Sequence, residues 1–231
     1  MLAWLVAVVA LVAEGDVPHE AVAAETIDNL TIDVDATGNA ASSNAFPVNT
    51  CIEVASSTAQ VIDIVIGPIG VPAQVGVKGF VATLFYKKSV VNVSAIDVNQ
   101  LLAVNPGSSP LHASDPTPNS DGAFTVAVAD TGSLPFSAES GPGVLVRVTL
   151  SAIGSDVSPL WLRDAGVVDI GNDLFTVNRV GFAFIAVDSP GACSSDSIGD
   201  NDGVPTAVDL CPATPSGDPA GVNGCPPTEE Y

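Results

Sequence analysis

Basic residues are scarce in this chain. Six lysines and arginines stand against 26 acidic residues among 231, and the formal net charge is −20. A surface of this sign repels phosphate backbones, so nucleic acid is not expected as a partner. It also repels anionic lipid headgroups, which disfavours binding to a membrane surface. The acidity instead suits cation binding, high solubility or a salty medium.

Side chains that carry hydrolytic chemistry are also few. The chain has two histidines, His19 in the N-terminal segment and His112 in a loop rich in Pro and Ser. A set drawn from Ser108 or Ser114, His112 and Asp115 would place all three partners in one loop, whereas a triad needs separate rigid elements. The sequence has no G-x-S-x-G elbow and no phosphate-binding glycine loop. We therefore expect His112 to be a solvated loop residue.

Glutamate is rare between the N-terminal segment and the tail, where only Glu25, Glu53 and Glu139 occur. A glycosidase needs two carboxyl groups that converge across a cleft. The aspartates lie mainly at the ends of apolar runs and in turns, where Asp is favoured for its local hydrogen bonds. We expect no enzyme, and a hydrolase is the least favoured reading.

Aromatic residues make up only 5% of the chain. A polysaccharide site would use a row of exposed rings, and the candidates are Trp161, Tyr86, Phe80 and Phe136. Phe80, with Phe182 and Phe184, follows an alternating pattern that predicts a core position. Trp161 and Tyr86 remain as a candidate ligand surface, although a buried tryptophan is the commoner case in a β-sandwich. The aromatic residues alone do not establish sugar binding.

An apolar run of eleven residues, 2–12, opens the chain. It is too short to span a bilayer, which takes about 20 residues, and it has the length of a signal-peptide core. The small residues at 21–24 offer a cleavage site before Glu25. No Lys or Arg precedes the run, and the alternative is a buried helix of the mature protein. We predict a signal peptide over residues 1–24.

The central region alternates short apolar runs with turn residues, after a polar segment (25–50) that we read as an irregular lead-in. Val, Ile, Thr and Phe dominate these runs, which predicts β-strands. No window has a clear helical period, and residues 95–104 could hold at most a short turn. Seven to nine strands at this spacing predict an antiparallel β-sandwich. The runs are 52–57, 60–67, 77–86, 90–96, 123–130, 143–152, 159–162 and 174–187.

Alternation within one run predicts which side chains share a face. In the run 143–152, Val144, Val146, Val148 and Leu150 are expected to face one way, and Arg147 and Thr149 the other.

Three segments of this region resemble the cohesin family. VGVKGFVATLFYKKSVVNV (75–93), DGAFTVAVADTGS (121–133) and GVLVRVTLSA (143–152) are similar to successive cohesin strands and their turns. The sequence departs from the family at Lys87-Lys88, where cohesins have Asp-Pro after the tyrosine. The resemblance covers about residues 50–187. It implies a jelly-roll sandwich of the cohesin and cellulose-binding superfamily, whose modules dock a calcium-loaded dockerin or bind polysaccharide.

The stretch 196–225 combines spaced acids, Gly, Pro and two Cys with few large apolar side chains, so it needs an ion and a disulfide to hold a shape. Asp200, Asp202, Gly203 and Asp209 occupy the third, fifth, sixth and twelfth places of a calcium loop, and Val204 would offer its carbonyl oxygen at the seventh.

With Cys211-Pro212, Thr214-Pro215, Gly217 and Gly224-Cys225, this stretch resembles a thrombospondin type 3 repeat. Ile198 and Thr206 stand where that family has acids, and Asp196 or Ser197 can take the first place after a small backbone shift. Fewer charged ligands mean weaker binding. The alternative is an acidic linker that no longer holds metal.

Four cysteines allow three disulfide connectivities. The resemblance to the repeat favours a Cys211–Cys225 bridge within it, which leaves Cys51 and Cys193 to join the two ends of the central region. Zinc is a poor alternative, because there is no CxxC pair and no Cys/His cluster. An even number of widely spaced cysteines suits an exported protein.

Together these features predict an all-β protein: an antiparallel jelly-roll β-sandwich (25–190) after a signal peptide (1–24), followed by a small C-terminal module (191–231). Structural calcium would be held by Asp196, Asp200, Asp202, Val204 and Asp209. We expect a secreted binding protein, with cell-surface attachment open and no segment that inserts into a membrane. Its partner would be a dockerin-type protein or a polysaccharide. A passive spacer or surface-layer component is the alternative.

Overall fold

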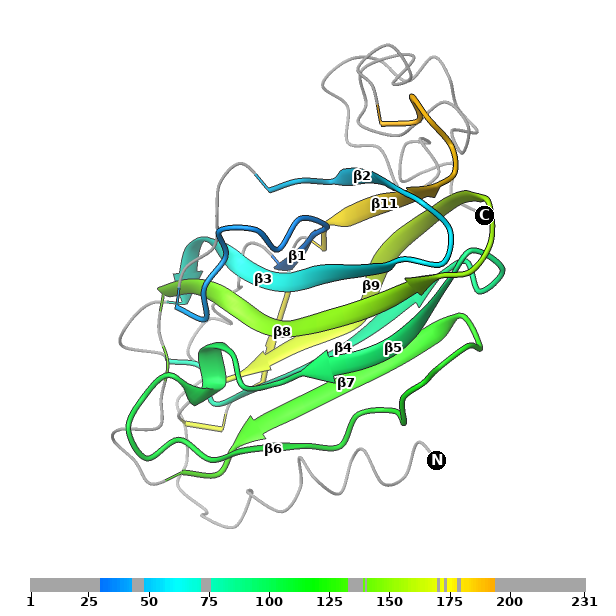
Figure 1. The fold of residues 1–231 in the computed structure, drawn as a ribbon. Helices are drawn as coiled ribbons and strands as arrows, with labels where there is room; N and C mark the ends of the chain where they lie inside the picture. Colours follow the sequence, from blue (N-terminus) through cyan, green and yellow to red (C-terminus); the bar gives the residue numbers. More distant parts are fainter. Residues whose placement is uncertain are drawn as a thin grey trace.

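The computed structural model describes residues 30–42, 48–71, 76–132, 139, 141–169, 171–172, 174–177 and 180–193. Within these ranges the chain forms strands β1 to β11 and one short 3₁₀ helix, η1 (Leu101–Ala103). The strands make two sheets that pack face to face (Figure 1). The prediction of an all-β sandwich is therefore confirmed.

The smaller sheet has four strands in the order β1-β3-β8-β5. All three of its strand pairs are antiparallel. The strands are β1 (Leu30–Asp33), β3 (Ala59–Val71), β8 (Gly141–Ala152) and β5 (Val91–Asp97).

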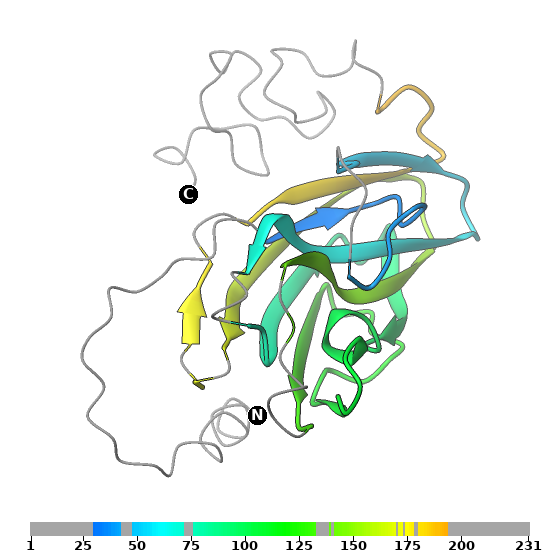
Figure 2. The ribbon, with the colours of Figure 1, turned by 90° about the vertical axis from the view of Figure 1, so that its left-hand side faces the viewer.

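The larger sheet runs in the order β2-β11-β9-β4-β7-β6, with β10 also paired to β9. Its pairs are antiparallel except β2 and β11, which run parallel. Figure 2 shows β10 as the short yellow strand set apart from the main body. The strands are β2 (Cys51–Val54), β11 (Phe182–Val187), β9 (Asp156–Val168), β4 (Gly79–Tyr86), β7 (Ala123–Asp130), β6 (Pro110–His112) and β10 (Leu174–Thr176).

Strict alternation explains how the larger sheet finds its core face. In β7 every second side chain from Phe124 to Asp130 is buried, and the residues between them are half-exposed. β4 alternates in the same way from Phe80 to Tyr86. Because side chains of a strand point to opposite faces in turn, one face of each strand joins the core and the other meets solvent. Burying each large apolar side chain contributes about 1.5–3 kcal/mol.

Each of the eight predicted runs contains a strand, and the last of them contains two, β10 and β11. The expected short turn in residues 95–104 is the helix η1. The prediction of an irregular lead-in over 25–50 was wrong at residues 30–33, which form β1 and pair with β3. His112 was predicted to lie in a loop, and it is exposed but belongs to the edge strand β6.

A bulge changes the predicted facing of β8. The register shifts between the pairs Ile64↔Val146 and Val65↔Val144. Val146, Val148 and Leu150 lie in the core as predicted, and Leu145 joins them. Val144 is also fully buried, but it lies outside that core cluster, opposite Val65, and its amide donates to the Ala41 carbonyl oxygen at 3.2 Å. The extra residue of the bulge is the physical reason for the error.

A disulfide joins Cys51, at the start of β2, to Cys193, which follows β11. This pairing confirms one of the two predicted bridges. Around it Val157, Phe184 and Ala186 form a second, smaller apolar cluster, against which both cysteines pack. In the part of the chain that the structure describes, no helix is long and apolar enough to cross a bilayer.

Candidate functional site

One face of the larger sheet packs on the core, and its opposite face is the candidate site. We call this the outer face. It is built from the alternate residues of β4, β7, β9 and β11 that do not join the core. They are Val81, Thr83, Phe85, Ala123, Thr125, Ala127, Ala129, Trp161, Arg163 and Phe182.

Three aromatic side chains form a row across the outer face. Phe182 pairs in register with Trp161, and Trp161 pairs with Phe85. The rings of Phe85 and Trp161 stack at 5.4 Å between centroids with an interplanar angle of 12°. The guanidinium carbon of exposed Arg163 lies 5.8 Å from the centroid of Phe85. The row thus combines apolar surface with a cation placed for a cation–π contact.

Small side chains flank the aromatic row. Thr83 and Thr125 are cross-strand partners whose hydroxyl oxygens lie 3.2 Å apart. Ala127 and Ala129 continue this surface along β7, and Leu111 of β6, opposite Ala129, is 61% exposed. Small residues beside half-buried aromatic side chains leave room for a protein partner to pack closely on this face.

Trp161 was a predicted ligand residue, and it lies in the centre of the aromatic row. Its side chain is half-buried, and its indole nitrogen Nε1 is buried with no hydrogen-bond acceptor in the described part of the chain. The ring therefore acts here through its apolar surface and not through its N–H group.

Tyr86 was the other predicted ligand residue, and this prediction was wrong. Only 4% of Tyr86 is exposed, because its position in β4 points it into the core. Its hydroxyl donates to the Asn119 carbonyl oxygen (2.9 Å) and lies against Asn119 Oδ1. Burial raises the pKa of the phenol, and the nearby charges of Asp121 and Asp115 add to this effect. Tyr86 holds the 119–122 turn in place.

The three phenylalanines predicted for the core have different places. Phe80 is 3% exposed and lies in the main core, as predicted. Phe184 is buried in the small cluster by the disulfide. Phe182 is half-buried on the outer face, its ring edge-on to Phe184 at 5.7 Å, so its core prediction was wrong.

The Ser and Asp side chains considered for a hydrolytic triad form hydrogen bonds with other residues. Ser108 Oγ bonds Glu139, Asp115 Oδ2 accepts from the Thr125 amide, and Ser114 Oγ accepts from the Ala127 amide. Each side chain is thereby committed to holding a turn or the β7 edge.

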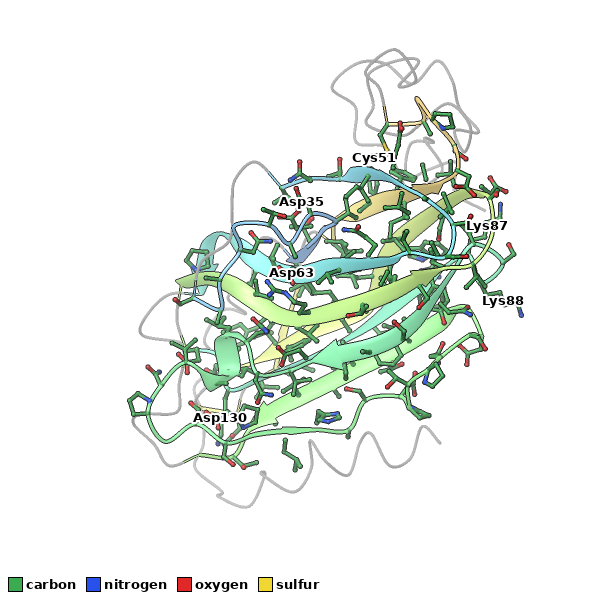
Figure 3. The ribbon with its side chains drawn as sticks, in the orientation of Figure 1. Asp35, Cys51, Asp63, Lys87, Lys88 and Asp130 are labelled. Carbon is green, nitrogen blue, oxygen red and sulfur yellow. A yellow bond between two sulfur atoms is a disulfide. The ribbon has the colours of Figure 1, made fainter. Side chains whose placement is uncertain are left out.

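A polar cluster occupies the solvent side of the smaller sheet, near the labelled Asp35 and Asp63 in Figure 3. Arg147 donates from Nε and Nη2 to the two oxygens of fully buried Asp63, at 2.8 and 2.9 Å. Asn39 Nδ2 bridges Asp63 to Asp33, at 3.1 and 3.0 Å. The bond to Asp63 raises the pKa of Arg147. Because each carboxylate is satisfied by protein donors, this cluster fixes the lead-in segment on the sheet.

The predicted calcium module lies outside the described residues. This applies to Asp196, Asp200, Asp202, Val204 and Asp209, to Cys211 and Cys225, and to the signal peptide. Among the residues that are described, no group of three or more His, Cys, Asp or Glu side chains converges to hold a metal ion.

No protein-family model matches this sequence, and no curated protein matches it. Solved structures do match. A chain from a type I cohesin–dockerin complex of Clostridium thermocellum has a TM-score of 0.50 and 13% sequence identity, and the match covers 71% of this chain and 99% of that chain. The fold is cohesin-like. At this identity the likeness concerns the fold alone.

Two further cohesins match with TM-scores of 0.48. One is the cohesin module of a family 33 glycoside hydrolase from Clostridium perfringens, at 18% identity over 71% of this chain and 98% of that chain. The other is the sixth cohesin of scaffoldin B from Acetivibrio cellulolyticus, at 14% identity over 69% and 98%.

Sequence reasoning missed Phe85, Arg163 and Phe182 as members of the site. Their strands are neighbours in the sheet in the order β11-β9-β4, although β5 to β8 separate β4 from β9 along the chain. The alternation of β4 did carry a signal, since Phe85 is out of phase with the buried residues Leu84 and Tyr86.

Proposed function

We propose that this protein is a secreted, non-enzymatic docking module that binds a dockerin-type protein through the outer face. The observation that carries the proposal is the aromatic row Phe182–Trp161–Phe85 on an otherwise small-residue sheet surface. Half-exposed aromatic side chains and an arginine are the residue types that dominate binding energy in protein interfaces.

The cohesin-like fold supports this choice of partner. The Clostridium thermocellum structure that shares the fold is a complex of a cohesin with a dockerin. A dockerin-type partner for this chain goes beyond that likeness, and it is the hypothesis that the outer face makes testable.

Polysaccharide is the less favoured ligand. A sugar-binding platform presents the flat faces of its rings to the ligand. Here the rings of Trp161 and Phe85 stack on each other, and Arg163 lies over Phe85, so these faces are in part already covered. Such rings offer their edges to a partner, which suits packing against side chains better than stacking on a sugar.

Export and calcium complete the proposal. The Cys51–Cys193 disulfide fits an oxidising compartment, which supports the signal peptide read from residues 1–24. We further propose that the C-terminal residues 191–231 form the calcium-stabilised module, closed by Cys211–Cys225. Calcium there would be structural, because it neutralises clustered carboxylates.

The first test is direct binding. The full chain would be immobilised, and purified type I dockerin modules, together with the dockerin-bearing proteins of the source organism, would be passed over it in calcium. We expect Trp161→Ala and Phe85→Ala each to weaken binding by about 2 kcal/mol or more, as for central interface aromatics. Trp161→Phe should retain more affinity than Trp161→Ala, since it keeps one aromatic ring while it removes the pyrrole half of the indole with its unpartnered N–H.

The matched control is Ile153→Ala, which truncates another exposed apolar side chain, 52% exposed, away from the outer face. It should bind like the parent chain. Binding that is insensitive to all outer-face substitutions would reject this face. Absence of any dockerin binding, together with retardation by polysaccharide in a gel, would favour sugar binding. If the chain bound neither dockerin nor polysaccharide, a passive spacer would be the remaining role.

A further inference from the structure

Two buried acids, Asp130 and Glu139, bond the same turn near the end of β7. Asp130 lies at the opposite end of the sandwich from Lys87 and Lys88 (Figure 3). Asp130 is the last residue of β7, and its amide bonds the Lys78 carbonyl oxygen. Glu139 pairs through its backbone with the neighbouring residue, Val77. Both carboxyl groups bond residues of one turn, 105–109, which follows η1. This site is separate from the outer face, because Asp130 points to the core side of β7.

Asp130 carries a carboxylate oxygen without a partner. The residue is 1% exposed. Its Oδ1 accepts hydrogen bonds from the amides of Ser109 (2.6 Å) and Gly132 (2.8 Å). Its Oδ2 is buried and has no hydrogen-bond partner in the structure as described. A buried, ionised oxygen with no partner is costly, so such an atom calls for a proton or a cation.

Glu139 brings a second carboxyl group to the same turn. It is 3% exposed, and its Oε1 accepts from the Asn105 amide (2.9 Å) and the Ser108 hydroxyl (3.3 Å). Burial raises the pKa of Glu139, and the charge of Asp130 adds to this effect. The two buried carboxyl groups thus bond one short turn, Asp130 at Ser109 and Glu139 at Asn105 and Ser108.

No described basic side chain compensates the pair. The two ion pairs among the described residues are Lys87–Asp156 and Arg147–Asp63, both elsewhere. Lys78, whose backbone carbonyl bonds the Asp130 amide, directs its Nζ to Asn172 Oδ1 at 3.2 Å. Asp63 offers the contrast, because Arg147 and Asn39 together satisfy both of its oxygens.

The turn approaches Asp130 closely through its backbone. A Cβ atom added to Gly132 would collide with the Gly107 carbonyl oxygen and would lie 3.0 Å from Asp130 Oδ1. The Gly107 carbonyl oxygen thus lies on the same side of Gly132 as Asp130 Oδ1. Carboxylates, backbone carbonyls and waters are the ligands that Ca²⁺ combines in proteins.

We propose that Asp130 and Glu139, with a carbonyl oxygen of the 105–109 turn, bind a divalent oxygen-seeking cation, of which Ca²⁺ is the best fit. The cation neutralises both acids and ties the ends of β7 and η1 together. With two carboxylates, its dissociation constant is expected on the order of 10⁻⁴–10⁻³ M, the range of extracellular calcium modules.

The test uses the full chain, freed of metal with a chelator. A parent variant, Asp200→Asn/Asp202→Asn/Asp209→Asn, removes the carboxylates of the C-terminal loop, so that calcium binding there cannot be mistaken for this site. Calorimetric titration with CaCl₂ should still detect one site, and calcium should raise the melting temperature. Asp130→Asn or Glu139→Gln in this parent should weaken calcium binding by about tenfold or more.

The control in the same parent is Asp156→Asn, which removes an exposed acid paired with Lys87 and should leave calcium binding unchanged. Absence of calcium binding by the parent overturns the proposal, as does binding that neither substitution alters. If Asp130→Asn fails to fold, the calcium affinity of Glu139→Gln alone decides whether the proposal stands. A metal-free parent that melts higher at pH 5 than at pH 7 and ignores calcium would mean that a shared proton satisfies the pair instead.

Discussion

Arg147 and Asp63 are directly opposed on β8 and β3, and their two-point contact is the main polar link of the smaller sheet. Asp63 is fully buried, whereas the side chain of Arg147 is 30% exposed. Removing one partner of such a pair leaves a buried charge uncompensated, which costs more than the intact pair contributes.

Arg147→Met is therefore expected to lower the free energy of unfolding by about 3–5 kcal/mol, measured by urea denaturation. The matched control is Arg163→Met, which removes an exposed arginine of the outer face whose described contact is with the Phe85 ring; its cost should stay below about 1 kcal/mol. In the double variant Asp63→Asn/Arg147→Met, the buried charge is absent and part of the loss should be recovered. Equal costs for the two single arginine variants would contradict this account.

At the scale of the element, β1 closes the sandwich at the edge of the smaller sheet. It pairs with β3 over four residues, and the Gly181 amide, just before β11, bonds the Leu30 carbonyl oxygen at 2.8 Å. β1 thus links the two sheets at one edge. Gly181 is needed for this approach, because an added Cβ would collide with the side chain of Thr31.

Gly181→Ala should therefore push β1 away from β11 and lower the free energy of unfolding by about 1–3 kcal/mol, as overpacking does. Hydrogen exchange is the sharper measurement: the amides of β1 should lose protection, while those of β4 and β7 should keep theirs. Gly181→Ala with unchanged exchange in β1 would show that the two elements are not coupled.

Apolar runs bounded by turn residues predicted most strands of the central region, and the alternation is clearest from Phe80 to Tyr86 in β4 and from Phe124 to Asp130 in β7. It failed for β1 and β6, which have four and three residues and lie in polar surroundings. It also misplaced Val144, since a bulge shifts the phase within β8. The aromatic row could not be predicted, because it depends on which strands are neighbours and on their register.

The whole molecule is held at one edge by the Cys51–Cys193 disulfide, whose cysteines are 142 residues apart in sequence. It joins the first strand of the larger sheet to the segment that leaves β11, and these two strands are parallel neighbours. A cross-link over so long a loop restricts the unfolded chain strongly, with a loop-closure estimate of about 5 kcal/mol as an upper value.

Cys51→Ser/Cys193→Ser is expected to lower the free energy of unfolding by about 2–5 kcal/mol in the absence of reductant. Cys211→Ser/Cys225→Ser is the matched control, because it removes the other two cysteines and leaves the sandwich cross-link intact. Its effect should be confined to the C-terminal module. A larger loss of sandwich stability in the control than in the first variant would refute this assignment.

The same cross-link decides how the protein responds to mechanical tension. A pull on the N-terminal side of the cysteines first loads β1, which precedes Cys51 and pairs with β3. Load that reaches Cys51 passes through the disulfide to Cys193, so the chain between the two cysteines is not drawn out. About 142 residues, or roughly 470–510 Å of extended chain, are thereby withheld from stretching. In an oxidising environment tension could detach β1 from β3 but could not extend the chain between the cysteines, and reduction of one bond would make that whole length extensible.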